Sequence, residues 1–163
     1  MDGRRALLVD AFTDTPFSGN AAGVVPDARG LAESQMQAIA NELGASETAF
    51  VLASEAADLR LRYFTPTTEV NLCGHATVAS LAHLAREDEL DSGDHAIETG
   101  AGVLDVEIAD DGRVWLTGAD PTVREVGVDA DRVADVLGIE LSAWEAVSEL
   151  SVAVASTGLP FLI

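Results

Sequence analysis

One segment of this chain, from His75 to about Arg86, has the spacing of a helix and is apolar on nearly every side. Its apolar residues are Ala76, Val78, Ala79, Leu81, Ala82 and Leu84. A helix at a protein surface needs only one apolar stripe, whereas a helix that is apolar all round is buried. The rest of the chain must therefore supply apolar surface that encloses this helix.

The segments on either side are mostly short, apolar and separated by Gly, Pro and Asp residues. Two further helices are predicted at residues 33–43 and 129–137, each followed by a glycine that ends it. Strands are predicted over residues 6–12, 20–25, 48–53, 59–63, 96–99, 103–108, 114–117 and 122–126. We expect one α+β domain over residues 1–163, with a curved, mostly antiparallel sheet wrapped around the central helix.

The final residues, 151–163, have the pattern of a strand, a turn and the beginning of another apolar strand. Ordinary domains seldom stop in the middle of an apolar run. Either the chain is part of a longer protein, or its last strand pairs with something outside it.

The chain is strongly acidic, with 28 Asp and Glu against nine basic residues and a formal net charge of −19. Such a surface repels phosphate backbones and anionic lipids, so we expect no nucleic-acid or membrane partner. The acidic residues are dispersed, which suits a protein dissolved in concentrated salt, although an acidic mesophilic protein is the alternative. The single cysteine, and the lack of an apolar leader or membrane-spanning run, predict a cytoplasmic protein.

The start of the apolar helix is the first candidate site. Unpaired backbone N–H groups and the helix dipole favour a carboxylate there, and Gly74 lets a ligand approach the backbone closely. The same field predicts a lowered pKa for Cys73, and His75 can exchange a proton near neutral pH. The alternative is a tight turn with a buried thiol and a capping histidine. No metal site is expected, because one cysteine and one histidine leave further ligands to be found.

Three other polar residues are candidates for the same site. Glu47 lies between a helix and an apolar strand, where partial burial would raise its pKa enough for proton transfer; the alternative is a solvated turn carboxylate. Asp10 alternates with Leu8 and Phe12, which predicts a buried carboxylate that needs a partner. Asn20 follows a glycine at the start of a strand and is either a turn residue or a substrate-binding amide.

Five stretches, in this order and with this spacing, resemble the N-terminal half of the PhzF-like phenazine-biosynthesis family. They are Val9-Asp-Ala-Phe-Thr13, Pro16-Phe-Ser-Gly-Asn20, Ser46-Glu-Thr-Ala-Phe50, Arg62-Tyr-Phe-Thr-Pro66 and Glu69-Val-Asn-Leu-Cys-Gly-His-Ala-Thr77. Residues 156–161, Ser-Thr-Gly-Leu-Pro-Phe, resemble the strand with which such proteins cross into their second half.

The resemblance implies the diaminopimelate-epimerase-like fold, in which two similar halves each wrap a barrel-like sheet around a helix and the active site lies between them. It also implies an isomerase without a cofactor, acting on a small carboxylic acid; the best-known substrate is a dihydro-hydroxyanthranilic acid. A glutamate takes a proton from one carbon and returns it to another. By this resemblance Glu47 transfers the proton, Gly74 and His75 belong to the pocket, Asn20 contacts substrate and Asp10 supports the site.

The chain departs from the family in two respects. Ala21 follows Asn20 where the family often has proline, and the second half, with its aspartate and glycine-rich loop, has no counterpart here. The expected partner is therefore that half or a second copy of the chain. Two alternatives stay open: a racemase or epimerase that uses Cys73 with a second cysteine, and a non-catalytic half-domain that binds or assembles through its unfinished sheet.

Overall fold

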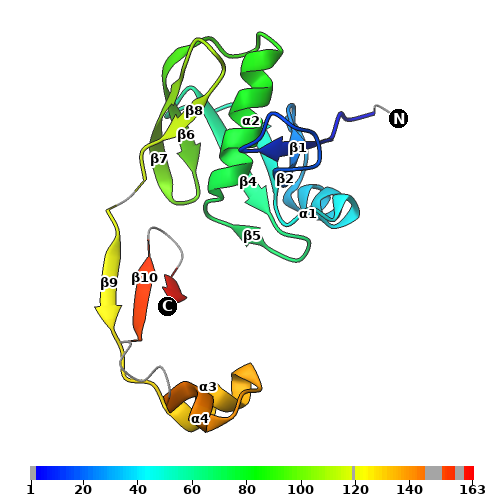
Figure 1. Ribbon diagram of the computed structural model, residues 1–163. Helices are drawn as coiled ribbons and strands as arrows, with labels where there is room; N and C mark the ends of the chain where they lie inside the picture. The colour runs from blue at the N-terminus through cyan, green and yellow to red at the C-terminus, as the bar shows by residue number, and fades with distance from the viewer. Residues whose placement is uncertain (1–2, 119, 146–151, 157–159) are drawn as a thin grey trace. The chain divides into compact units, whose positions relative to one another are not determined.

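The computed structural model describes residues 3–118, 120–145, 152–156 and 160–163. The chain divides into two compact units, Met1–Thr117 and Gly118–Ile163, which are described separately (Figure 1). The expectation of one domain over residues 1–163 stays a prediction.

In the first unit, eight strands of the described chain form one sheet, in the order β1-β2-β3-β4-β6-β7-β8 with β5 paired to β4 (Figure 1). Pairs β2–β3 and β4–β6 are parallel and the other pairs are antiparallel. The sheet is therefore mixed with an antiparallel majority, as the α+β prediction required. The strands are β1 (Leu7–Ala11), β2 (Asn20–Val25), β3 (Thr48–Leu52), β4 (Leu59–Phe64), β5 (Glu69–Val70), β6 (Gly93–Thr99), β7 (Gly102–Ile108) and β8 (Val114–Leu116).

Helix α2 (Gly74–Arg86) lies against this curled sheet and contacts strands β1, β2, β3, β7 and β8 (Figure 1). Its fully covered residues are Ala76, Thr77, Ala79, Ser80, Leu81 and Leu84. The small side chains among them, those of Ala76, Ala79 and Ser80, let strands from both ends of the sheet approach the helix. The predicted central helix is confirmed, and its two buried hydroxyl residues show that it is less purely apolar than its sequence pattern indicated.

A second apolar cluster lies between helix α1 (Glu33–Leu43) and the sheet. Met36 and Ala40 of α1 pack there with Phe50 and Phe64, whose rings meet edge to face at 5.4 Å between centroids. Edge-to-face pairs contribute about 0.5–1.5 kcal/mol beyond the burial of their area. This cluster fixes α1 on the sheet, and so fixes the start of the loop that leads to β3.

An ion-pair network joins α1 to strands β4 and β5. The Arg62 guanidinium donates to both carboxylate oxygens of Glu69, at 2.6 and 2.7 Å, and to Glu33 Oε2 at 2.8 Å. Arg62 also lies over the Phe64 ring, 5.2 Å from its centroid. The bidentate pair holds the pKa of the Glu69 carboxyl below its ordinary value.

The Glu69→Gln variant is therefore expected to lose about 0.5–1 kcal/mol of unfolding free energy at neutral pH, since a third of the Glu69 side chain is exposed and screened. A depressed folded-state pKa stabilises the fold above the unfolded-state pKa, and the contribution is lost as pH falls through the folded-state value. The difference from wild type should shrink in denaturant melts between neutral pH and about pH 3. Glu42→Gln, at an exposed carboxylate of α1 outside the described ion pairs, is the matched control. A difference that does not change with pH would contradict this assignment.

The second unit contains β9 (Thr122–Glu125), β10 (Ala153–Ser156) and β11 (Pro160–Leu162), with β10 antiparallel to both others. Helix α3 (Ala130–Leu137) is capped as predicted by Asp129, whose carboxylate accepts from the Arg132 N–H, and Gly138 follows its last residue. The two strands predicted at the end of the sequence are present as β10 and β11, while Ser151 and residues 157–159, where a turn was predicted, lie outside the described residues. Helix α4 (Leu141–Glu145) and strand β5 were not expected from the sequence.

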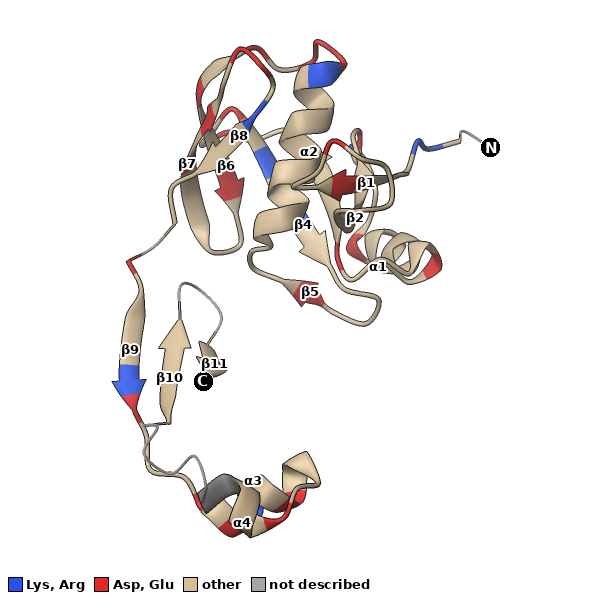
Figure 2. Ribbon diagram, viewed as in Figure 1, with Lys and Arg blue, Asp and Glu red and all other residues tan. Residues whose placement is uncertain are grey.

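Acidic residues are dispersed along the ribbon of both units, and arginines are few (Figure 2). No helix in the described part of the chain has the length and apolar character needed to cross a membrane.

Candidate active site

Glu47 is positioned by the junction between α1 and β3. Helix α1 ends at Gly44, whose φ of 66° lies in the left-handed region that glycine adopts easily. The chain then turns toward β3, and the N–H of Gly23 in β2 donates to the Glu47 carbonyl at 2.9 Å. This hydrogen bond anchors the Glu47 backbone to the sheet one residue before β3 begins.

Cys73 caps the start of α2 with an extended backbone. Its carbonyl accepts from the Thr77 N–H at 3.0 Å and from the Thr77 hydroxyl at 2.8 Å. Because that hydroxyl donates to Cys73, the buried Tyr63 hydroxyl, 2.7 Å away, donates to Thr77 Oγ1. Burial also raises the pKa of Tyr63, which keeps this donor protonated. The chain of hydrogen bonds fixes the first turn of α2 on strand β4.

The two junctions bring Glu47, Cys73 and His75 together. His75 Nδ1 lies 3.2 Å from Cys73 Sγ, and His75 Nε2 lies 3.5 Å from Glu47 Oε2. The imidazole is 14% exposed and the glutamate side chain 25% exposed, so both are largely enclosed but open to solvent at one side. Ser46 Oγ, 3.4 Å from His75 Nε2, adds a group that the sequence analysis did not single out. Ser46 could have been recognised from the sequence by its position next to Glu47 in the Ser46–Phe50 motif.

The thiol of Cys73 is not activated as the helix position indicated. Burial, and secondarily the carboxylate of Glu47, raise its pKa to about 11, although backbone N–H groups at the helix start act in the opposite direction. The prediction of a lowered pKa is wrong because removing the thiolate from water costs more than the helix start contributes. A protonated thiol that donates to His75 Nδ1 leaves the proton of a neutral imidazole on Nε2, facing Glu47.

Gly74 opens this site to a ligand. It is exposed, and a Cβ placed there would have no atom within 4 Å. There is therefore free space at Gly74, at the start of α2 beside Glu47 and His75. A helix N-terminus of this kind attracts a carboxylate.

Asp10 and Asn20 form a separate feature at the β1–β2 hairpin. Asp10 accepts from the Phe17 N–H at 2.7 Å and so holds the loop between the strands. Its neighbours Leu8 and Phe12 are 63% and 72% exposed, so the expected buried carboxylate is wrong: this face of β1 points to solvent. Asn20 is exposed at the start of β2, opposite Ala11. Within the described residues, neither side chain forms a hydrogen bond with Glu47, Cys73 or His75.

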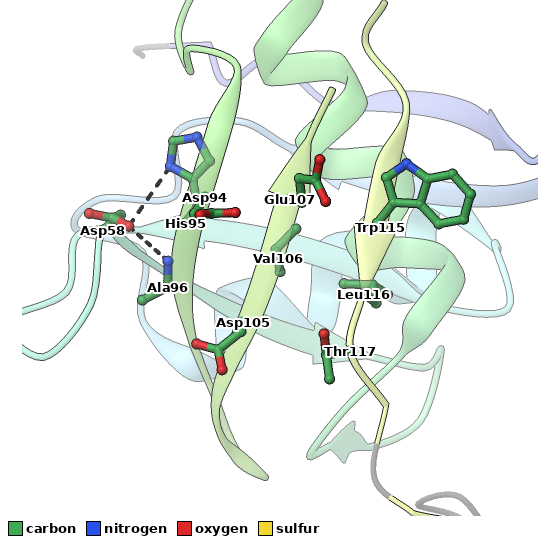
Figure 3. Close-up of a pocket in the computed structure, with 10 residues that line it drawn as sticks. All are labelled: Asp58, Asp94, His95, Ala96, Asp105, Val106, Glu107, Trp115, Leu116 and Thr117. Carbon is green, nitrogen blue, oxygen red and sulfur yellow. Dashed lines mark hydrogen bonds and ion pairs between the residues drawn. The ribbon is translucent and has the colours of Figure 1, made fainter. Parts of the chain in front are cut away.

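A cavity of about 790 Å³ lies on strands β6 to β8 and shares no residue with the Glu47 cluster. Figure 3 shows the carboxylates of Asp58, Asp94, Asp105 and Glu107 around it, beside Trp115. Asp58 accepts from the Ala96 N–H at 2.8 Å and lies 3.8 Å from His95 Nδ1 (Figure 3). Four carboxylates repel an anionic substrate, so the Glu47 cluster is the better candidate for carboxylic acid chemistry.

Comparisons with known proteins agree on one family. The sequence model for phenazine biosynthesis-like proteins (PhzC-PhzF) matches residues 9–163. The "Uncharacterized isomerase YfhB" of Bacillus subtilis is 45% identical over 157 residues, which is 94% of this chain and 53% of that protein. The crystal structure of the PhzF-family phenazine biosynthesis protein of Bacillus anthracis is 36% identical with a TM-score of 0.84, covering 99% of this chain and 55% of that one.

A hydroxyproline epimerase from Agrobacterium vitis is only 14% identical but has a TM-score of 0.59 over 96% of this chain and 50% of its own. That likeness shows the fold alone. The chain spans about half the length of the curated relatives it matches.

The resemblance inferred from the five motifs is thus confirmed, and so is the diaminopimelate-epimerase-like fold. Several curated relatives are named isomerases, which supports an isomerase or epimerase family. The chain belongs to the phenazine biosynthesis-like, or PhzF, family.

Proposed function

We propose that this chain supplies the acid/base half of an isomerase active site, which moves a proton at a carbon atom of a small carboxylic acid. The observation that carries the proposal is the contact of Glu47 with His75 at the open start of helix α2. Glu47 removes the proton and returns it, and the N–H groups beside Gly74 hold the substrate carboxylate. No cofactor takes part in this step, and the second half of the site comes from another segment or a second copy of the chain.

His75 orients Glu47 through Nε2, and its other nitrogen is occupied by Cys73 Sγ. A charge that develops on a carbon next to a carboxylate is stabilised by donors already fixed in place. The first turn of α2 is such a set of donors, because Cys73 and Thr77 hold its geometry. Asn20 joins the substrate site in this proposal, and Asp10 supports it through the hairpin loop.

The test is a screen of small carboxylic acids in deuterated water, with protein expressed from its complete reading frame. A mass increase in the substrate reports proton exchange at carbon. We expect exchange by the wild type and its loss in Glu47→Gln. If no carboxylic acid exchanges, the proposal fails.

The cysteine mechanism is the second candidate, and the 3.2 Å contact between Cys73 Sγ and His75 Nδ1 favours it, because the imidazole could accept the thiol proton. The raised pKa of the thiol opposes it. Cys73→Ser distinguishes the two: exchange lost in Cys73→Ser but kept in Glu47→Gln would establish the thiol as the acid/base. The non-catalytic alternative predicts no exchange in any variant.

Gly74→Ala probes the approach to the helix start. The position has room for a methyl group and no left-handed φ, so the fold should tolerate the change within about 1 kcal/mol. The methyl group would stand where the substrate carboxylate approaches the N–H groups. We expect kcat/KM to fall by about tenfold or more, mainly through KM, while thermal melting changes little. An unaltered kcat/KM would place the carboxylate elsewhere.

A further inference from the structure

Glu47, Cys73 and His75 together have a property that the proton-transfer proposal does not use. One carboxylate oxygen, the thiol sulfur and one imidazole nitrogen all lie within 4.8 Å of one another. Two of the three residues flank Gly74 at the start of α2, and the third comes from the loop before β3, anchored by Gly23. Cys73 and His75 alone are too few ligands for a metal, and the fold adds Glu47, which is distant from them in the sequence.

The donor set selects a class of ion. Thiolate and imidazole together suit Zn²⁺ and its thiophilic relatives, whereas Mg²⁺ and Ca²⁺ require oxygen ligands. In tetrahedral Zn²⁺ sites neighbouring donor atoms lie roughly 3.3–3.7 Å apart, as follows from the usual bond lengths. Cys73 Sγ and His75 Nδ1 are already 3.2 Å apart. A carboxylate oxygen of Glu47 lies within 4.8 Å of the sulfur and of an imidazole nitrogen, so the Glu47 side chain would have to turn toward them to share one ion.

The surroundings complete the coordination. A metal on His75 Nδ1 leaves the Nε2–H facing Ser46 Oγ, 3.4 Å away, which would fix the orientation of the ring. The side of the cluster beside Gly74 is open, so water can take the fourth position. Three protein ligands with a water in the fourth position are typical of catalytic zinc sites, whereas structural zinc sites have four protein ligands.

We propose that Glu47, Cys73 and His75 bind one thiophilic divalent cation, with Zn²⁺ as the prototype. Binding forms the metal–sulfur bond and releases the thiol proton to solvent. The bound ion occupies the carboxylate and imidazole and thereby blocks the site reversibly; this inhibitory consequence, unlike the binding itself, rests on the proposed function.

Co²⁺ is the probe for binding, because a cobalt–thiolate bond gives a charge-transfer band in the near ultraviolet. The chain has one cysteine, so such a band reports Cys73 alone. Titration of the full chain should give a band that saturates at one equivalent and disappears when Zn²⁺ is added. Ionic attraction of Co²⁺ to the many acidic residues produces no such band.

The variants make the result specific. Cys73→Ser should abolish the band, and Glu47→Gln and His75→Gln should each weaken Co²⁺ binding by at least tenfold. His95→Gln, at a half-buried histidine beside Asp58 in the acidic cavity, is the matched control and should bind as the wild type does. Circular dichroism verifies that each variant is folded. A band of wild-type strength in both Glu47→Gln and His75→Gln would mean that the thiol alone binds cobalt, and it would overturn the proposed site, as would no band at all.

Inhibition is tested separately with the deuterium-exchange assay. Zn²⁺ should suppress exchange over the concentration range in which it displaces Co²⁺, and a chelator should restore it. If the metal binds but exchange persists, the inhibitory part fails while the site stands. If the metal binds and no substrate exchanges even after chelation, the proposed function fails and the metal site remains.

Discussion

Glu47→Gln is expected to lower the rate of deuterium exchange into substrate by about a thousandfold, since a positioned general base contributes roughly 10²–10⁴-fold. Glutamine keeps the size of the side chain and can still form a hydrogen bond with His75 Nε2, 3.5 Å away in the wild type. It cannot accept the proton from carbon. The loss should therefore appear in kcat, with little change in thermal melting because the site lies at an open edge of the fold.

Two comparisons make this result interpretable. Glu42→Gln, at an exposed position of α1, has the same change of charge and should leave exchange unaltered. Cys73→Ser should reduce exchange far less than Glu47→Gln, because the thiol is protonated at neutral pH. Equal losses in Glu47→Gln and Glu42→Gln would point to the loss of charge in general and would remove Glu47 from the mechanism.

Gly23→Ala has the largest expected effect on stability, about 3 kcal/mol, at the upper end of the cost of overpacking a core. Gly23 pairs with Thr48 across the parallel β2–β3 ladder. A Cβ at Gly23 would collide with Thr48 Oγ1 and would lie 2.9 Å from the Cβ and Cγ2 atoms of the same residue. Thr48 is fully buried and cannot move aside, so the two strands must separate.

The separation should also displace Glu47, whose carbonyl accepts from the Gly23 N–H. Urea denaturation measures the first effect, and residual exchange activity of the folded fraction measures the second. Thr48→Ala removes the colliding hydroxyl and methyl, and that hydroxyl has no hydrogen-bond partner among the described residues. The double variant should therefore recover about 1–2 kcal/mol relative to the sum of the single changes. Gly127→Ala, where a Cβ would meet no atom within 4 Å, is the control. Strict additivity in the cycle would contradict the collision.

Most helices and strands of this fold could be predicted from the sequence because their hydrophobic periodicity is strong. The predicted range of helix α1 and the predicted range of β2 coincide with the observed ones, and Leu59, Leu61 and Tyr63 are buried in alternation as β4 requires. Strand β5 could not be predicted because its two residues are too few to show an alternation of apolar and polar side chains. The division into two units depends on contacts distant in sequence, which no local pattern contains.

The site was harder to predict, and the errors have physical causes. Asp10 was predicted to be buried because it shares a face of β1 with the apolar residues Leu8 and Phe12, but both of these side chains are exposed. A lowered pKa was predicted for the Cys73 thiol because it lies at the start of a helix, but burial raises the pKa by more than the helix start lowers it. The proximity of Glu47 and His75 depends on the parallel pairing of β2 with β3 and on the docking of α2, so the residues alone did not determine it.

The hydrogen bonds from Tyr63 through Thr77 to Cys73 have a practical consequence. They fix the first turn of α2 at Cys73, which is 9% exposed and is the only cysteine in the chain. An alkylating reagent is much bulkier than a metal ion or a water molecule, so its reaction with this sulfur should be slow until the first turn of α2 opens locally. The rate of thiol labelling would then report how often that opening occurs. The Cys73 sulfur, although poorly suited to act as a nucleophile, can therefore be used to measure local opening of the active site.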